Sequence, residues 1–109
     1  MTSTHIALST APNEEVARTL VRTLVEERIV ACGNIVPGVN SIYRWQGAVS
    51  EEPEVLIVFK TSAAAWPRLQ ERLPELHPYE TPELLLVSVA DGLAPYLQWV
   101  TDSTESVHE

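Results

Sequence analysis

Residues 55–61 read Val-Leu-Ile-Val-Phe-Lys-Thr, and this stretch decides the fold. Its first five residues are apolar at odd and even positions alike, whereas a strand with one solvated face would alternate. The pattern predicts a central strand that ends at Lys60-Thr61 and is covered on both faces. A layer of side chains is therefore expected on each side of the sheet that contains this strand.

Two segments with helical periodicity lie on either side of this strand in the sequence. The first runs from Asn13, a good N-cap followed by two glutamates, to about Arg28. Its apolar residues recur at helical spacing: Val16, Ala17, Leu20, Val21, Leu24 and Val25. The second helix is predicted to begin between Ala64 and Trp66, with Pro67 in its first turn. Its buried stripe is expected to comprise Leu69, Leu73 and Leu76.

Three other segments are typical of strands. Residues 4–10 alternate loosely, residues 29–46 are extended with a bend at Pro37-Gly38, and residues 83–90 are strongly apolar. In the second half of the long segment, Val39, Tyr43 and Trp45 share one face. A short C-terminal helix is expected to start at Asp91 or Gly92, with Leu97, Trp99 and Val100 facing inward. A polar, frayed tail is predicted from about residue 103.

The predicted order is strand, helix, strand, strand, helix, strand and a short terminal helix. This order indicates an α+β, ferredoxin-like βαββαβ fold in a single domain spanning residues 1–109. Both long helices would cover one face of a four-stranded sheet, and the chain has only its short C-terminal helix left for the other face. Because the central strand is apolar on both faces, we expect several copies to pack their sheets together around a symmetry axis.

Composition excludes several classes of function. The formal charge of −8, with Lys60 as the only lysine, would repel nucleic acid. Cys32 is the only cysteine, so the chain forms neither an intrachain disulfide nor a four-cysteine zinc site, and a reducing compartment fits best. No signal pattern and no membrane-spanning apolar run is evident. We therefore expect a cytoplasmic protein without nucleic-acid or membrane partners.

The segment His77-Pro78-Tyr79-Glu80-Thr81-Pro82-Glu83 is the densest in chemically useful groups. Its two prolines predict a rigid loop between the second helix and the last strand. A histidine beside carboxylates can bind a transition metal, although copper and zinc sites usually need two or more nitrogen or sulfur ligands. The alternative is a structural histidine bonded to a neighbouring carbonyl or carboxylate. Cys32 also has two interpretations, an inert small apolar residue or a nucleophile, and the second would need a nearby histidine.

Aromatic residues with polar edges suit a pocket or an interface: Tyr43, Trp45, Tyr79, Tyr96 and Trp99. Lys60 is expected to form a structural ion pair or to face a ligand. The acidic cluster Glu51, Glu52 and Glu54 is interpreted as a solvated hairpin end. No phosphate-binding glycine loop, H-E-x-x-H motif or paired nucleophile and base is evident, so the sequence does not indicate an enzyme.

Several segments are distinctive as a set: 9–13 (Ser-Thr-Ala-Pro-Asn), 31–35 (Ala-Cys-Gly-Asn-Ile), 42–47 (Ile-Tyr-Arg-Trp-Gln-Gly), 59–61 (Phe-Lys-Thr), the loop 77–83, and Tyr96-x-x-Trp99. Taken together, they resemble the CutA family of divalent-cation-tolerance proteins. The resemblance spans nearly the whole chain. It implies a ferredoxin-like fold assembled as a tight homotrimer, similar in architecture to PII signalling proteins, and a link to copper and other divalent cations.

The resemblance supports two hypotheses about function. In the first, a non-enzymatic trimer binds copper or another divalent metal ion, with His77 and Cys32 as ligands and no organic cofactor. Some relatives tied to copper carry a cysteine in place of Ser9 and a second histidine in place of Leu76, so this chain retains only part of that set. In the second, a trimeric small-molecule sensor or adaptor holds an organic ligand in a cleft between subunits. The residues expected to line that cleft are Trp45, Lys60, Tyr79, Glu80 and Glu83.

Overall fold

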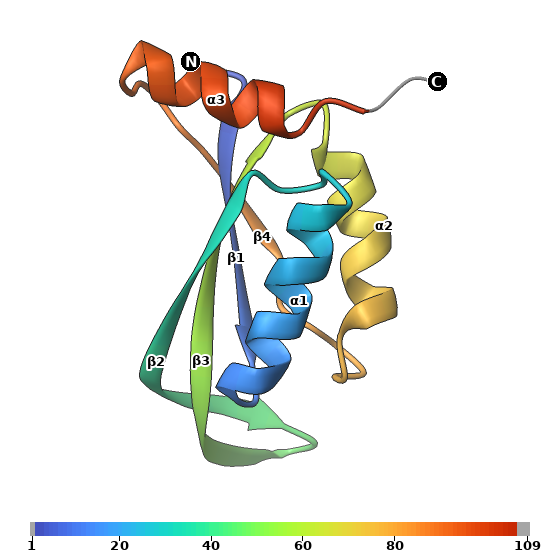
Figure 1. The fold of residues 1–109 in the computed structure, drawn as a ribbon. Helices are drawn as coiled ribbons and strands as arrows, with labels where there is room; N and C mark the ends of the chain where they lie inside the picture. Colours follow the sequence, from blue (N-terminus) through green and yellow to red (C-terminus); the bar gives the residue numbers. More distant parts are fainter. Residues whose placement is uncertain (1, 107–109) are drawn as a thin grey trace.

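The computed structural model describes residues 2–106 and has the predicted order of elements (Figure 1). These are β1 (Thr4–Ala11), α1 (Glu14–Glu26), β2 (Cys32–Trp45), β3 (Ala48–Ser62), α2 (Trp66–Leu76), β4 (Leu85–Ser88) and α3 (Ala94–Ser103). The four strands form one sheet in the order β2-β3-β1-β4, and all neighbouring pairs are antiparallel. The ferredoxin-like prediction is therefore confirmed.

The core lies between the sheet and the two long helices, which cover the same face (Figure 1). Alternate residues of β3 point toward these helices and are fully or almost fully buried: Val55, Ile57 and Phe59. They meet buried leucines from both helices: Leu20, Leu24, Leu69 and Leu73. α1 begins where its sequence predicts, because the side-chain Oδ1 of Asn13 accepts a 2.8 Å hydrogen bond from the backbone N–H of Val16.

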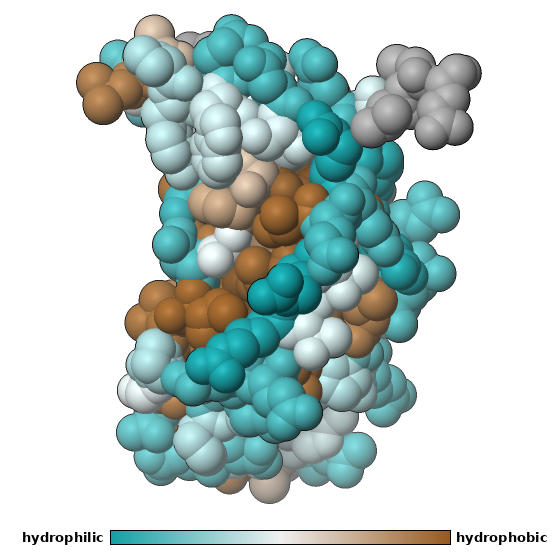
Figure 2. All heavy atoms as spheres, viewed as in Figure 1, coloured by the Kyte–Doolittle hydropathy of each residue, from teal (hydrophilic) through white to brown (hydrophobic). Residues whose placement is uncertain are grey.

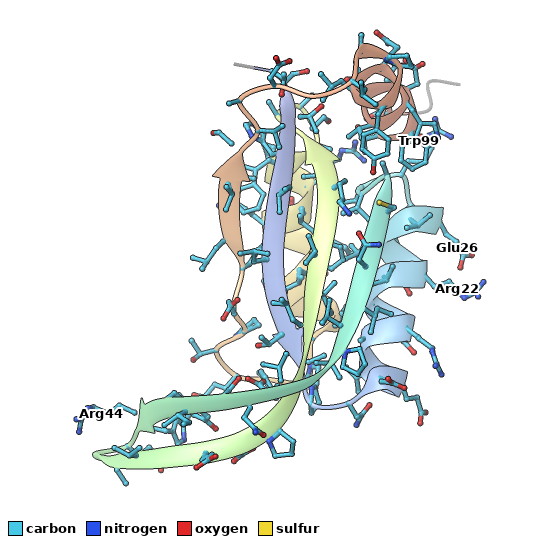
Figure 3. All side chains as sticks on the ribbon, turned by 90° about the vertical axis from the view of Figure 1, so that its left-hand side faces the viewer. Arg22, Glu26, Arg44 and Trp99 are labelled. Carbon is cyan, nitrogen blue, oxygen red and sulfur yellow. The ribbon has the colours of Figure 1, made fainter. Side chains whose placement is uncertain are left out.

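The opposite face of the sheet has no helical layer within the described residues, and Figure 3 shows its strands facing the viewer with α1 and α2 behind them. Its central apolar side chains are half-buried: Ile6, Leu8, Leu56 and Val58. Those at its margins are exposed: Val36, Leu85 and Val87. We call these seven residues the open face. β3 is apolar on both faces, but within one chain the helices cover only one of them.

A second apolar surface lies in a groove between α1 and the edge strand β2. Val21, Val25 and Ile35 line it, and Arg18 and Arg22 stand among its polar residues. Figure 2 shows apolar side chains gathered in the hollow between these two elements, bordered by hydrophilic ones.

The hairpin of β2 and β3 extends far beyond the rest of the sheet, because β1 ends at Ala11, opposite Val55. A β-bulge between Val36 and Val39, at the predicted Pro37-Gly38 bend, shifts the register, and the hairpin curves away from the other strands (Figure 3). Its tip is a two-residue turn in which Gln46 and Gly47 have φ of 50° and 81°. In the hairpin, Pro53 lies opposite Asn40.

Several predicted boundaries were wrong. β4 covers only Leu85–Ser88, because it pairs with just four residues of β1 and the preceding Glu83 carbonyl accepts a hydrogen bond from the Ser9 hydroxyl instead. α3 begins at Ala94, later than predicted, and its Trp99 faces outward rather than inward.

The prediction of a frayed tail from about residue 103 was also wrong in part. The Thr104 hydroxyl is buried and donates to the Ser62 hydroxyl at 2.8 Å, which fixes the chain just beyond α3. The rest of the predicted tail, residues 107–109, lies outside the described residues. No helix between residues 2 and 106 has the length and apolar character needed to cross a membrane.

Candidate ligand cleft

A cleft of about 610 Å³ opens where the hairpin bends past the loop 77–83. β2 contributes Ser41, Ile42, Tyr43 and Trp45, β3 contributes two glutamates, and β1 contributes Thr10. The side chains that define its chemistry are aromatic or acidic: Tyr43, Trp45, Glu52, Glu54, Tyr79 and Glu83. This volume lies within the range of small-molecule sites, which is roughly 300–1,000 Å³.

Strand pairing explains why the hairpin places aromatic and acidic side chains together. Ser41 is opposite Glu52, and Tyr43 is opposite Ser50. Directly paired residues project to the same face of a sheet, and residues two apart do so as well. The face that carries Tyr43 and Trp45 on β2 therefore carries Glu52 and Glu54 on β3.

Two hydrogen bonds and a contact between two rings hold the loop 77–83 beside this face. The Ser9 hydroxyl donates to the Glu83 carbonyl at 2.7 Å. The Tyr79 hydroxyl donates to Oε2 of Glu54 at 2.7 Å, which joins the loop to β3. The rings of His77 and Tyr79 lie 4.6 Å apart between centroids and are tilted by 50°. Together with the two prolines, these contacts hold the loop in one position.

His77 uses both of its ring nitrogens to hold this loop. Nε2 lies 2.7 Å from the carbonyl oxygen of Thr10, and Nδ1 accepts a hydrogen bond from the backbone N–H of Tyr79 at 3.1 Å. Because a carbonyl only accepts, Nε2 is the nitrogen that donates, which leaves the lone pair of Nδ1 for Tyr79. The imidazole is buried, and both of its hydrogen-bonding positions are occupied.

The two tyrosines of the cleft are held in their neutral form. Burial, and then the hydrogen bond to Glu54, raises the pKa of Tyr79 well above its usual value. Loss of solvent around the Tyr43 phenol, and then the nearby charge of Glu52, raises the pKa of Tyr43 as well. Both rings therefore stay uncharged further into the alkaline range than an ordinary tyrosine, which is already neutral at physiological pH.

The structure brings most of the predicted ligand residues together. Trp45, Tyr79, Glu80 and Glu83 all line the cleft. Lys60 is not among the lining residues, and its Nζ instead donates to the side-chain oxygen of Asn34.

The two predicted metal ligands have different surroundings. His77 forms hydrogen bonds with Thr10 and Tyr79. Cys32 lies at the start of β2, opposite Lys60 of β3, and its Sγ is 3.8 Å from the Tyr96 hydroxyl. Within residues 2–106, no three His, Cys, Asp or Glu side chains are grouped so that they could hold a metal ion. Donors from a single chain therefore do not fit a copper site, since copper would have to displace an existing partner of His77.

One lining residue was misinterpreted from the sequence. Glu52 and Glu54 were expected to lie on a solvated hairpin end; Glu52 is exposed as expected and also lines the cleft, whereas Glu54 is half-buried and accepts a hydrogen bond from Tyr79. The sequence does contain a signal for the position of these glutamates, namely their spacing from the hairpin turn. Counting back along both strands from the turn at Gln46-Gly47 places these glutamates on the same face as Tyr43 and Trp45.

Comparisons with known proteins agree with this fold. Residues 5–103 match the family model described as "CutA1 divalent ion tolerance protein". The divalent-cation tolerance protein CutA of Thermus thermophilus is 52% identical over 100 residues, which cover 92% of this chain and 97% of that protein. Human protein CutA is 43% identical over 107 residues, covering 98% of this chain but only 60% of the human protein.

Solved structures give the same result. The Thermus thermophilus protein has a TM-score of 0.91 at 50% identity, covering 94% of this chain and 99% of that one. CutA of Xylella fastidiosa has a TM-score of 0.93 at 36% identity, covering 95% and 100%. By sequence and by fold, the chain belongs to the CutA1 divalent ion tolerance family.

Proposed function

We propose that this protein acts in divalent-cation tolerance as a homotrimer that binds a small ligand in the cleft between the hairpin and the loop 77–83. The cleft is the observation that carries this proposal, because aromatic and acidic groups from three segments, β2, β3 and the loop 77–83, converge on one volume of about 610 Å³. Hydrogen bonds hold the loop in place before any ligand arrives. Such preorganisation reduces the entropic cost of binding.

The open face supports assembly into a homotrimer. Its apolar side chains, including the exposed Leu85 and Val87, need a covering layer that the described residues do not supply. Copies that pack these faces around a three-fold axis would cover them symmetrically. The groove between α1 and β2 offers further apolar area for contact with another copy.

Two leucine substitutions test the assembly. Leu85 lies on the open face and is 57% exposed in the single chain, whereas Leu93 precedes α3 and is 80% exposed. Both should tolerate glutamate without loss of the fold. Light scattering should give a trimer for the wild type and for Leu93→Glu, and a smaller species for Leu85→Glu. A wild-type monomer would refute the trimer.

Direct binding of copper or another divalent cation is the second candidate. The names of the relatives and the carboxylates of the cleft favour it, although an all-oxygen set suits harder cations better than copper. Among the ligands predicted from the sequence, His77 and Cys32 would supply nitrogen and sulfur, combined with donors from another subunit.

A titration of metal-free protein with Cu(II) and Zn(II), repeated with His77→Ala and Cys32→Ser, tests this second candidate. Binding tighter than about 100 μM that is lost in either variant would support it. Equal binding by all three proteins would exclude both residues as ligands.

We further propose that the protein works in the cytoplasm, where its single cysteine suits reducing conditions. The structure of CutA from Archaeoglobus fulgidus, 26% identical to this chain, is described as that of a periplasmic protein. Fractionation of cells that express this chain would decide between the two compartments.

A further inference from the structure

The charged side chains that line the cleft are all acidic. Four glutamates line it, Glu52, Glu54, Glu80 and Glu83, and no lysine or arginine does so within the described residues. The salt bridges found in residues 2–106 involve other glutamates, Glu14, Glu27 and Glu75. Carboxylates gathered around a concave surface produce a negative potential that attracts cations and repels anions.

Three aromatic rings share this volume with the carboxylates. Tyr43, Trp45 and Tyr79 line the cleft, and the first two are 39% and 44% exposed in the single chain. The π face of a neutral aromatic ring attracts cations, and Trp and Tyr do so better than Phe. Rings and carboxylates in one pocket are the combination that recognises alkylated ammonium groups.

Size separates the possible cations. A metal ion with its ligands occupies little more than the volume of a few water molecules, each about 30 Å³, whereas the cleft measures about 610 Å³. The aromatic rings also contribute nothing to the coordination of a hard metal ion. The cleft is thus large enough for an organic molecule and offers that molecule apolar as well as charged surface.

We propose that this cleft binds an organic ammonium compound, whose cationic head lies among Tyr43, Trp45 and Tyr79 and is neutralised by the surrounding glutamates. The proposal rests on the proposed function in one respect, namely that the cleft is the ligand site, and it adds the chemical class of the ligand. It requires neither a bound metal nor a covalent step.

The experiment compares two probes of nearly the same shape. Choline carries a quaternary ammonium group, and 3,3-dimethylbutan-1-ol has a neutral carbon in its place. Isothermal titration of the assembled wild-type protein at low salt should show choline binding at least tenfold more tightly than the alcohol, a difference of about 1.4 kcal/mol. Addition of salt should weaken the binding of choline and leave that of the alcohol unchanged.

Two tryptophans of nearly equal exposure supply the matched variants. Trp45 lies in the cleft and is 44% exposed, whereas Trp99 lies on α3 and is 45% exposed. Trp45→Leu should weaken choline binding at least tenfold, and Trp99→Leu should leave it unchanged. Glu52→Gln should weaken it as well, with little effect on the fold because Glu52 is exposed. Circular dichroism and light scattering verify the fold and the assembly of each variant.

The outcomes separate this proposal from the function on which it rests. If both probes bind equally and both depend on Trp45, the cleft is a ligand site but its preference for cations is refuted. If choline binding does not depend on Trp45, or if neither probe binds below about 10 mM, the ammonium proposal is refuted. A thermal-shift panel of anionic and neutral compounds on wild type and Trp45→Leu then tests whether the cleft binds any ligand.

Discussion

We expect the hydrogen bond between Tyr79 and Glu54 to stabilise the position of the loop 77–83. The substitution Tyr79→Phe removes this hydrogen bond and keeps the ring. The oxygens are 2.7 Å apart, a short separation typical of a hydroxyl that donates to a carboxylate. Hydrogen bonds to charged groups contribute about 1.5–3 kcal/mol when they are buried. Glu54 is only half-buried, so water can replace the lost partner in part, and we expect a loss near the lower end, about 1–1.5 kcal/mol.

The assay is equilibrium unfolding in guanidinium at one fixed protein concentration, because assembly makes apparent stability depend on concentration. A double-mutant cycle with Glu54→Ala, which removes the acceptor, isolates the pair, and we expect a coupling energy of about 1 kcal/mol. Tyr43→Phe is the control, since it removes a hydroxyl from a more exposed ring of the same cleft and should cost only a few tenths of a kcal/mol. A coupling energy below about 0.3 kcal/mol would show that this bond does not fix the loop.

Three further measurements test other parts of the structure. In an alkaline titration followed by phenolate absorbance, Tyr79 should ionise above pH 10, because its pKa is raised in the folded state. The stability that it contributes is therefore present below pH 10 and is lost as the pH rises through the folded-state pKa. An unchanged titration curve for Tyr79→Phe would contradict this. Asn13→Ala should destabilise the fold by about 1 kcal/mol in urea unfolding and Asn13→Asp should retain most of that stability, since only the second keeps an acceptor for Val16; equal losses would exclude a capping role. Gly33→Ala should cost about 1–3 kcal/mol, because the new Cβ would lie 2.9 Å from both methyl groups of Val21, and Val21→Ala in the same chain should restore part of the loss; additive losses would argue against this contact.

The fold could be predicted because its main signals are local. The stripe on α1, the capping Asn13 and the apolar run from Val55 to Phe59 each specify an element without reference to distant residues. The short β4 could not be predicted, because its ends depend on a side-chain hydrogen bond from Ser9, 74 residues away in the chain. The outward position of Trp99 likewise depends on where α3 meets the sheet.

The candidate site was predicted in part for a similar reason. Trp45, Tyr79, Glu80 and Glu83 stood out because they lie in dense, unusual motifs. Glu54 did not stand out, since its role follows from strand register rather than from its neighbours in sequence. His77 was recognisable as important, but only the structure shows that Thr10 and Tyr79 occupy both of its ring nitrogens.

The prolines of the long hairpin have a consequence for how the protein avoids aggregation. Beyond Ala11 the hairpin is a two-stranded ribbon, and such ribbons invite further strands to add along their free edges. Pro37 interrupts one strand and Pro53 the other, and each lacks the N–H that an added strand would need. A strand added along either edge would therefore meet only short runs of backbone N–H donors. We expect the two prolines to oppose growth into a continuous fibre without preventing assembly into a closed oligomer.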